Sequence, residues 1–165
     1  MSARLIVADA GPLIALAVGG VLPACLTLLG GLVVPQDVLD ECNADPWAHG
    51  AAVISELRDQ GRFQLVDHAT LAPLDPAFAQ GLGTGEIAVL AYAAAHHLAA
   101  LIDERRARRV ARVLNVAVIG SGALLVDLKR QGAIASVKPV LAAWKAHGYF
   151  LAEAVGKEIL LRANE

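Results

Sequence analysis

Four acidic residues stand beside apolar segments, where a charge is costly unless something compensates it. Asp9 and Asp103 directly follow the runs "LIVA" and "AALI", while Glu41 ends "VPQDVLDE" and Glu86 lies in "GTGEIAVL". Two like charges about 4 Å apart repel by about 4 kcal/mol at an effective dielectric of about 20. Mg²⁺ and Mn²⁺ prefer oxygen ligands and would offset this repulsion. The four acids therefore predict a metal site, provided that they converge.

Each acid also has a structural explanation that needs no metal. Asp9 and Asp103 could cap the helices that follow them, because Asp is a favoured N-cap residue. Glu86 could complement a helix dipole, and Glu41 could be an exposed residue of an amphipathic helix. Glu104 is a reserve candidate for the site, but its side chain should diverge from that of its neighbour Asp103. For any one of these acids the structural explanation is more common than a metal site. The presence of all four together favours the metal site.

The elements that must position these acids alternate between strands and helices. Apolar runs predict strands at 5–8, 32–34, 63–66, 99–102 and 116–119, and the segments between and after them predict helices at 11–18, 22–29, 35–42, 48–60, 85–97, 104–114, 121–131, 137–147 and 151–162. Thr84 is the expected cap of the helix at 85–97, and residues 68–85 are an expected loop. This order predicts one domain over residues 1–165, an α/β/α sandwich of three layers with a mainly parallel sheet.

Composition limits the class of protein. Of the 165 residues, 56% are hydrophobic and 18% are charged, which excludes a disordered chain. The net charge of −2 gives no global signature of a DNA-coating protein. The apolar surplus predicts a homodimer. Cys25 and Cys42 fit no metal-binding spacing and are expected to be reduced thiols of a cytoplasmic protein. Trp47 and Trp144 are expected to pack in the interior rather than stack on bases.

Two other interpretations fail on their spacing. Residues 10–36 carry no charge and are long enough to span a membrane, but glycines and prolines break them into short elements, so we expect no membrane span. "GLGTGE" and "IGSG" match neither dinucleotide-binding nor P-loop patterns. A phosphatase of the haloacid-dehalogenase type would carry a second Asp two residues after Asp9, where this chain has Gly11.

Taken in order, the segments "LIVADAGPLIALA", "VVPQDVLDE", "GTGEIAVLAYA" and "ALIDERRARRVARVLNVAVIGS" resemble the PIN domain family, in the branch close to VapC-type toxins. The resemblance implies an α/β/α sandwich that binds Mg²⁺ or Mn²⁺ and cuts RNA. Asp9, Glu41, Glu86 and Asp103 match the family's catalytic acids, and Ser121 matches its small hydroxyl residue. Two departures are Glu86, where many toxins carry Asp, and "IDERRAR", where toxins often carry a Thr-x-Asp pattern.

The resemblance also implies a role for each matched residue. Asp9 and Asp103 would be the primary metal ligands, and Glu86 would complete the metal site directly or through water. Glu41 would bind metal or orient the attacking water. Ser121 would hydrogen-bond an acid or a phosphate of the substrate.

Arginines follow Asp103 in "RRARRVAR" and are candidates for holding the RNA backbone. Helical spacing places Arg105, Arg108 and Arg112 on one face, with Arg106 and Arg109 nearby. We expect Arg105, Arg106 and Arg109 to bind substrate; the alternative is a solvated helix surface. Two functions stay open: an endoribonuclease, as the toxin partnered by a small antitoxin protein, or a non-catalytic PIN-like module that binds protein or nucleic acid.

Overall fold

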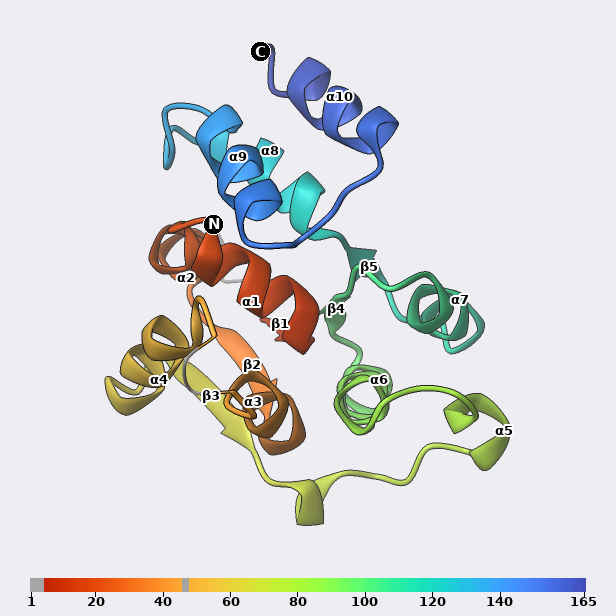
Figure 1. The fold of residues 1–165 in the computed structure, drawn as a ribbon. Helices are drawn as coiled ribbons and strands as arrows, with labels where there is room; N and C mark the ends of the chain where they lie inside the picture. Colours follow the sequence, from red (N-terminus) through yellow and green to blue (C-terminus); the bar gives the residue numbers. More distant parts are fainter. Residues whose placement is uncertain (1–4, 46–47) are drawn as a thin grey trace.

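The computed structural model describes residues 5–45 and 48–165, and at its centre lies a parallel sheet of five strands in the order β3-β2-β1-β4-β5 (Figure 1). The strands are β1 (Ile6–Ala8), β2 (Leu32–Pro35), β3 (Phe63–Val66), β4 (Ala99–Leu101) and β5 (Val118–Ile119). The helices are α1 (Ala10–Val18), α2 (Leu22–Leu29), α3 (Gln36–Cys42), α4 (Ala51–Asp59), α5 (Pro76–Ala79), α6 (Thr84–His96), α7 (Arg105–Val113), α8 (Ser121–Arg130), α9 (Lys138–Ala146) and α10 (Glu153–Arg162).

Helices cover both faces of this sheet, so the predicted three-layer α/β/α architecture is confirmed. Helix α6 packs against β1, β2 and β4. In Figure 1 the helices α8, α9 and α10 lie above the sheet and α6 lies below it. A sheet that is covered on both faces needs strands that are apolar throughout. Accordingly, every residue of β1 and β2 is buried.

The strand order creates a topological switch between β1 and β4. The chain runs from β1 to β2 and β3 on one side, and then returns to place β4 and β5 on the other side. Val7 pairs with Val33 of β2, and Ala8 pairs with Leu101 of β4. Ligands of open parallel sheets bind beyond the carboxyl ends of the strands at such a point. The most favourable place for a site is therefore the end of β1 and β4.

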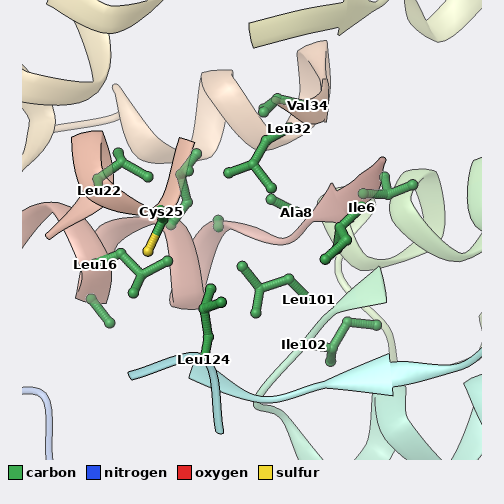
Figure 2. Close-up of a cluster of buried hydrophobic side chains, with 14 of the residues drawn as sticks. Ile6, Ala8, Leu16, Leu22, Cys25, Leu32, Val34, Leu101, Ile102 and Leu124 are labelled. Atoms are coloured by element: carbon green, nitrogen blue, oxygen red, sulfur yellow. The ribbon is translucent and has the colours of Figure 1, made fainter. Parts of the chain in front are cut away.

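The core lies on both sides of β1 (Figure 2). Ile6, Leu16, Leu101 and Leu124 are all at most 2% exposed. Burying each such side chain contributes about 1.5–3 kcal/mol relative to leaving it in water. This core holds the strand ends, and with them the acids, in fixed positions.

The two cysteines are free and buried, in agreement with the prediction of reduced thiols. Burial raises the pKa of Cys25 and of Cys42 to about 12. Because the thiolate is the reactive form, both side chains are inert packing residues.

Several predicted boundaries were wrong. The helix predicted at 48–60 begins only at Ala51, because Gly50 has a left-handed backbone with φ of 91°. The predicted strand at 116–119 forms only over β5. Thr84 does not cap α6: Gly83 occupies the N-cap position and Thr84 is the first helical residue.

The predicted loop at 68–85 contains two short helical elements. The first is a 3₁₀ turn over His68–Thr70, and the second is α5. Asp67 caps the turn and Asp75 caps α5, each through a side-chain oxygen that accepts a backbone N–H. Capping Asp residues are a local signal that overrides the loop-like composition of this segment.

No single helix in residues 5–45 and 48–165 is long and apolar enough to cross a membrane. Helices α1 and α2 pass the length and composition test only as a pair, and they are bent by 117° relative to each other. Trp144 is 1% exposed, which confirms its predicted packing role, whereas Trp47 lies outside the described residues.

Candidate metal centre

Three neighbouring strands deliver the polar residues of the candidate site to one edge of the sheet. Asp9 directly follows β1, and its backbone N–H donates to the carbonyl of Leu101 at 3.0 Å, which ties it to β4. Asp103 lies two residues beyond the end of β4, and Ser121 begins α8 just after β5. The switch point of the fold therefore carries Asp9 and Asp103 side by side in strand order, with Ser121 next.

Asp9 is the most deeply buried acid of the site, with 6% of its surface exposed. It occupies the N-cap position of α1, but its side chain makes no capping hydrogen bond. The pKa of Asp9 is raised to about 7, mainly by burial and in addition by the negative charges of Glu86, Glu41 and Asp103, while the backbone N–H of Ala10 lowers it. The Asp9 side chain therefore does not cap α1, and the charges of Glu86, Glu41 and Asp103 all act on Asp9 at this edge.

Glu41 reaches the site because α3 and α6 approach closely at Gly85. A Cβ atom on Gly85 would lie 2.9 Å from Oε2 of Glu41 and 3.8 Å from Oδ1 of Asp9. Both carboxylates therefore border the same small space over the start of α6. Burial, and then the charge of Glu86, raise the pKa of Glu41.

Glu86 has a helix-start role as well as a place in the site. Its Oε2 accepts the backbone N–H of Gly83 at 2.8 Å, which satisfies one of the free donors at the start of α6. This agrees with the structural explanation offered for Glu86. The same charge still acts on both Asp9 and Glu41.

Asp103 is held by three donors from outside its own strand. The backbone N–H of Ser121 donates to Oδ1 at 2.8 Å, and the Ser121 hydroxyl donates to Oδ2 at 2.6 Å. The hydroxyl of Tyr149 donates to the same Oδ2. The prediction that Ser121 hydrogen-bonds an acid is confirmed. Tyr149 was missed, since nothing in its sequence context distinguishes it from an ordinary packing aromatic.

The capping explanation of Asp103 was wrong, because Glu104 caps α7 instead. Oε2 of Glu104 accepts the backbone N–H of Arg106 at 2.6 Å and that of Ala107 at 2.9 Å. The Glu104 side chain thus caps its own helix, as expected if it points away from the side chain of Asp103. Asp103 remains directed toward Ser121 and Tyr149.

Arg108 lies beside the carboxyl end of β4, next to Asp103. Its Nε donates to the carbonyl of Ile102 at 3.0 Å, which fixes the guanidinium beside the end of β4. A Cβ atom on Gly120 would lie 2.8 Å from Nη2 of Arg108 and 3.3 Å from Oδ1 of Asp103. Gly120 therefore provides the room in which this guanidinium and this carboxylate face the same space.

The three arginines predicted to bind substrate lie elsewhere on α7. Arg106 donates to the carbonyl of Gln80 at 2.7 Å and so fastens the loop before α6. Arg105 and Arg109 are exposed. Within the described parts of the chain, none of the four acids forms an ion pair with an arginine or lysine.

The candidate ligands are carboxylate oxygens, which are the ligands that a hard divalent cation prefers. In the structure, however, these carboxylates do not converge on one point. Among residues 5–45 and 48–165, no three Asp, Glu, His or Cys side chains are close enough to share a metal ion. The physical reason is that like charges repel, and Glu86 and Asp103 are turned toward nearby N–H and O–H donors. Asp9 keeps a buried carboxyl group whose negative form a cation such as Mg²⁺ or Mn²⁺ would stabilise.

Comparison with known protein families identifies a match over nearly the whole chain. The model of the family DUF3368, which is described as a PIN domain, matches residues 5–165. This range includes every strand and helix from β1 to α10. No curated protein matches the chain.

Proposed function

The chain belongs to the PIN domain family, and from this premise we propose that it is a metal-dependent endoribonuclease that hydrolyses phosphodiester bonds in RNA. PIN domains are generally nucleases, so the expected class of reaction is hydrolysis. The observation that carries the proposal is Asp9, a buried carboxylate at the switch point whose pKa is raised by burial and by three further acids.

Asp9 and Asp103 would hold the cation, and Glu86 would complete the site directly or through water. A bound Mg²⁺ or Mn²⁺ lowers the pKa of coordinated water and stabilises negative charge on a phosphate oxygen. Ser121 keeps Asp103 in one orientation by donating to both of its oxygens. Glu41 borders the same space as Asp9, and its raised pKa makes it a better proton acceptor for an attacking water.

The substrate's phosphates would lie along α7 beside Asp103. Arg108 and Arg112 line a cavity of about 310 Å³ together with Val116 and Val118. Arg108 also borders Asp103 at Gly120, which connects this cavity to the acids. Arginines bind phosphates through paired N–H donors. Arg105, Arg106 and Arg109 stay predicted contacts on the same helix. Because these contacts are electrostatic, we expect salt to weaken RNA binding.

Calorimetric titration with Mn²⁺, paired with cleavage of a mixed RNA pool, tests this proposal. We expect the wild type to bind Mn²⁺ and cut RNA, Asp9→Asn to lose both activities, and Asp103→Asn to cut no RNA and to bind Mn²⁺ measurably more weakly. Asp127→Asn is the matched control, because Asp127 is an exposed residue of α8 outside the site. A wild-type protein that neither binds Mn²⁺ nor cuts RNA would instead favour a non-catalytic module, for which the separation of the acids also argues.

The toxin role and the homodimer belong to the same proposal. A small antitoxin protein would dock near the negative charge of the acids, and a complex with a distant interface would contradict this. Phe150 and Leu161 are 80% and 75% exposed, and such apolar surface supports self-association. A sedimentation experiment that finds only monomer would contradict the dimer. A cytoplasmic location is supported by the two free thiols.

A further inference from the structure

Tyr149 brings a hydroxyl group into the acidic site from the C-terminal helices. It lies in the connection between α9 and α10, which pack above the sheet (Figure 1). Its hydroxyl donates to Oδ2 of Asp103, across 46 positions of the sequence. The family resemblance assigns no role to this position. The contact therefore links a tyrosine hydroxyl directly to an acid that is a candidate metal ligand.

The ring of Tyr149 is held in place on several sides. Its backbone N–H donates to the carbonyl of Trp144 at 2.8 Å, and the two rings lie 5.1 Å apart between centroids. Trp144 is itself fixed, since its Nε1 donates to the buried carbonyl of Ala15 in α1 at 2.6 Å. Helix α1 begins directly after Asp9. The hydroxyl of Tyr149 is thus anchored, through Trp144, to the element that follows the other principal acid.

The hydrogen bonds at Asp103 determine which part of it stays available. A carboxylate has about four acceptor positions, two on each oxygen. Ser121 and Tyr149 both donate to Oδ2 and fill it, while from the residues that the structure describes Oδ1 accepts only the backbone N–H of Ser121. One acceptor position therefore remains, on Oδ1. Asp103 is presented as a ligand through a single oxygen, without displacement of either hydroxyl.

We propose that Tyr149 is a positioning residue for Asp103, which it fixes so that a divalent cation meets a preoriented carboxylate oxygen. The inference rests on the proposed metal site. Partners that orient a metal ligand by hydrogen bonding change metal affinity by about 10- to 100-fold when they are removed. Tyr149 is such a hydrogen-bonding partner of Asp103. The metal site therefore depends on how the segment between α9 and α10 packs against the sheet.

The test is a calorimetric Mn²⁺ titration of Tyr149→Phe, which removes the hydroxyl and keeps the ring. We expect Mn²⁺ to bind about 10- to 100-fold more weakly than to the wild type. Tyr92→Phe is the matched control: Tyr92 lies on α6, where it stacks on His96, and the same chemical change there should leave Mn²⁺ affinity unchanged. Circular dichroism and tryptophan fluorescence confirm that each variant is folded.

A double-mutant cycle separates positioning from a general structural effect. Because Tyr149 acts through Asp103, adding Tyr149→Phe to Asp103→Asn should cause no further loss of Mn²⁺ affinity. Additive losses, or wild-type affinity in Tyr149→Phe, would overturn the inference while the metal site itself stands. A wild type that binds Mn²⁺ in a Tyr149-dependent manner but cuts no RNA would retain the inference and reject the nuclease. A wild type that binds no Mn²⁺ would reject both.

Discussion

Replacing Asp9 by Asn should stabilise the metal-free protein, and increasingly so as the pH rises. Asp9 is 6% exposed and is surrounded by acids. Its pKa is raised from 3.8 to about 7, first by burial and then by Glu86, Glu41 and Asp103. The folded protein therefore holds the Asp9 proton over a pH range in which the unfolded chain has already released it.

The sign follows from this difference in proton binding. Between about pH 4 and pH 7 the unfolded state ionises at Asp9 and is favoured, so the stability of the wild type falls as the pH rises. At roughly 1.4 kcal/mol per pKa unit, the full effect is about 4 kcal/mol. Asn lacks the titrating proton. The stability difference between Asp9→Asn and wild type should therefore grow by about 4 kcal/mol from pH 4 to above pH 7.

Urea unfolding of both proteins in EDTA, followed by circular dichroism across this pH range, measures the difference directly. Asp127→Asn is again the control and should show no such pH-dependent gain. Mn²⁺ at a concentration 100 times its Kd should raise the free energy of unfolding of the wild type by about 2.7 kcal/mol. It should not change the free energy of unfolding of Asp9→Asn. A difference between Asp9→Asn and wild type that does not change with pH would refute the reasoning about burial and charge at this site.

Three further substitutions test the packing around the site. In Gly120→Ala the new Cβ would lie 2.8 Å from Nη2 of Arg108, so we expect weaker RNA binding with a smaller salt dependence, measured by fluorescence anisotropy. Gly85→Ala would place a Cβ 2.9 Å from Oε2 of Glu41; we expect a loss of about 1–3 kcal/mol in urea unfolding and a lower cleavage rate, and unchanged values would contradict the close approach. Trp144→Phe removes the indole N–H that donates to the carbonyl of Ala15, which keeps the backbone N–H of Gly19 as a donor, so we expect the lost hydrogen bond to cost about 0.5–1.5 kcal/mol; unchanged stability would show that this hydrogen bond is dispensable.

Local patterns were enough to predict the architecture. Apolar runs separated by helical segments indicate a parallel sheet, because strands covered on both faces must be apolar throughout. The carboxyl ends of such strands lie at one edge, so the sequence pattern places Asp9 and Asp103 at the same edge, and the strand order of the structure makes them neighbours. The errors were at boundaries. The late start of α4 depends on the left-handed backbone of Gly50, which residue periodicity does not reveal.

The groups that donate hydrogen bonds to these acids could be identified only from the tertiary structure. Tyr149 and Asp103 are 46 positions apart, and Trp144 is 129 positions from Ala15, whose carbonyl it binds. Such contacts arise from how α9 and α1 pack over the sheet, and no periodicity in the sequence encodes them. The sequence by itself determined which acids reach the edge of the sheet, because a strand's direction and its last residue are local properties. Only the packing of distant elements decided which donors hold each acid, since that depends on where whole helices come to rest.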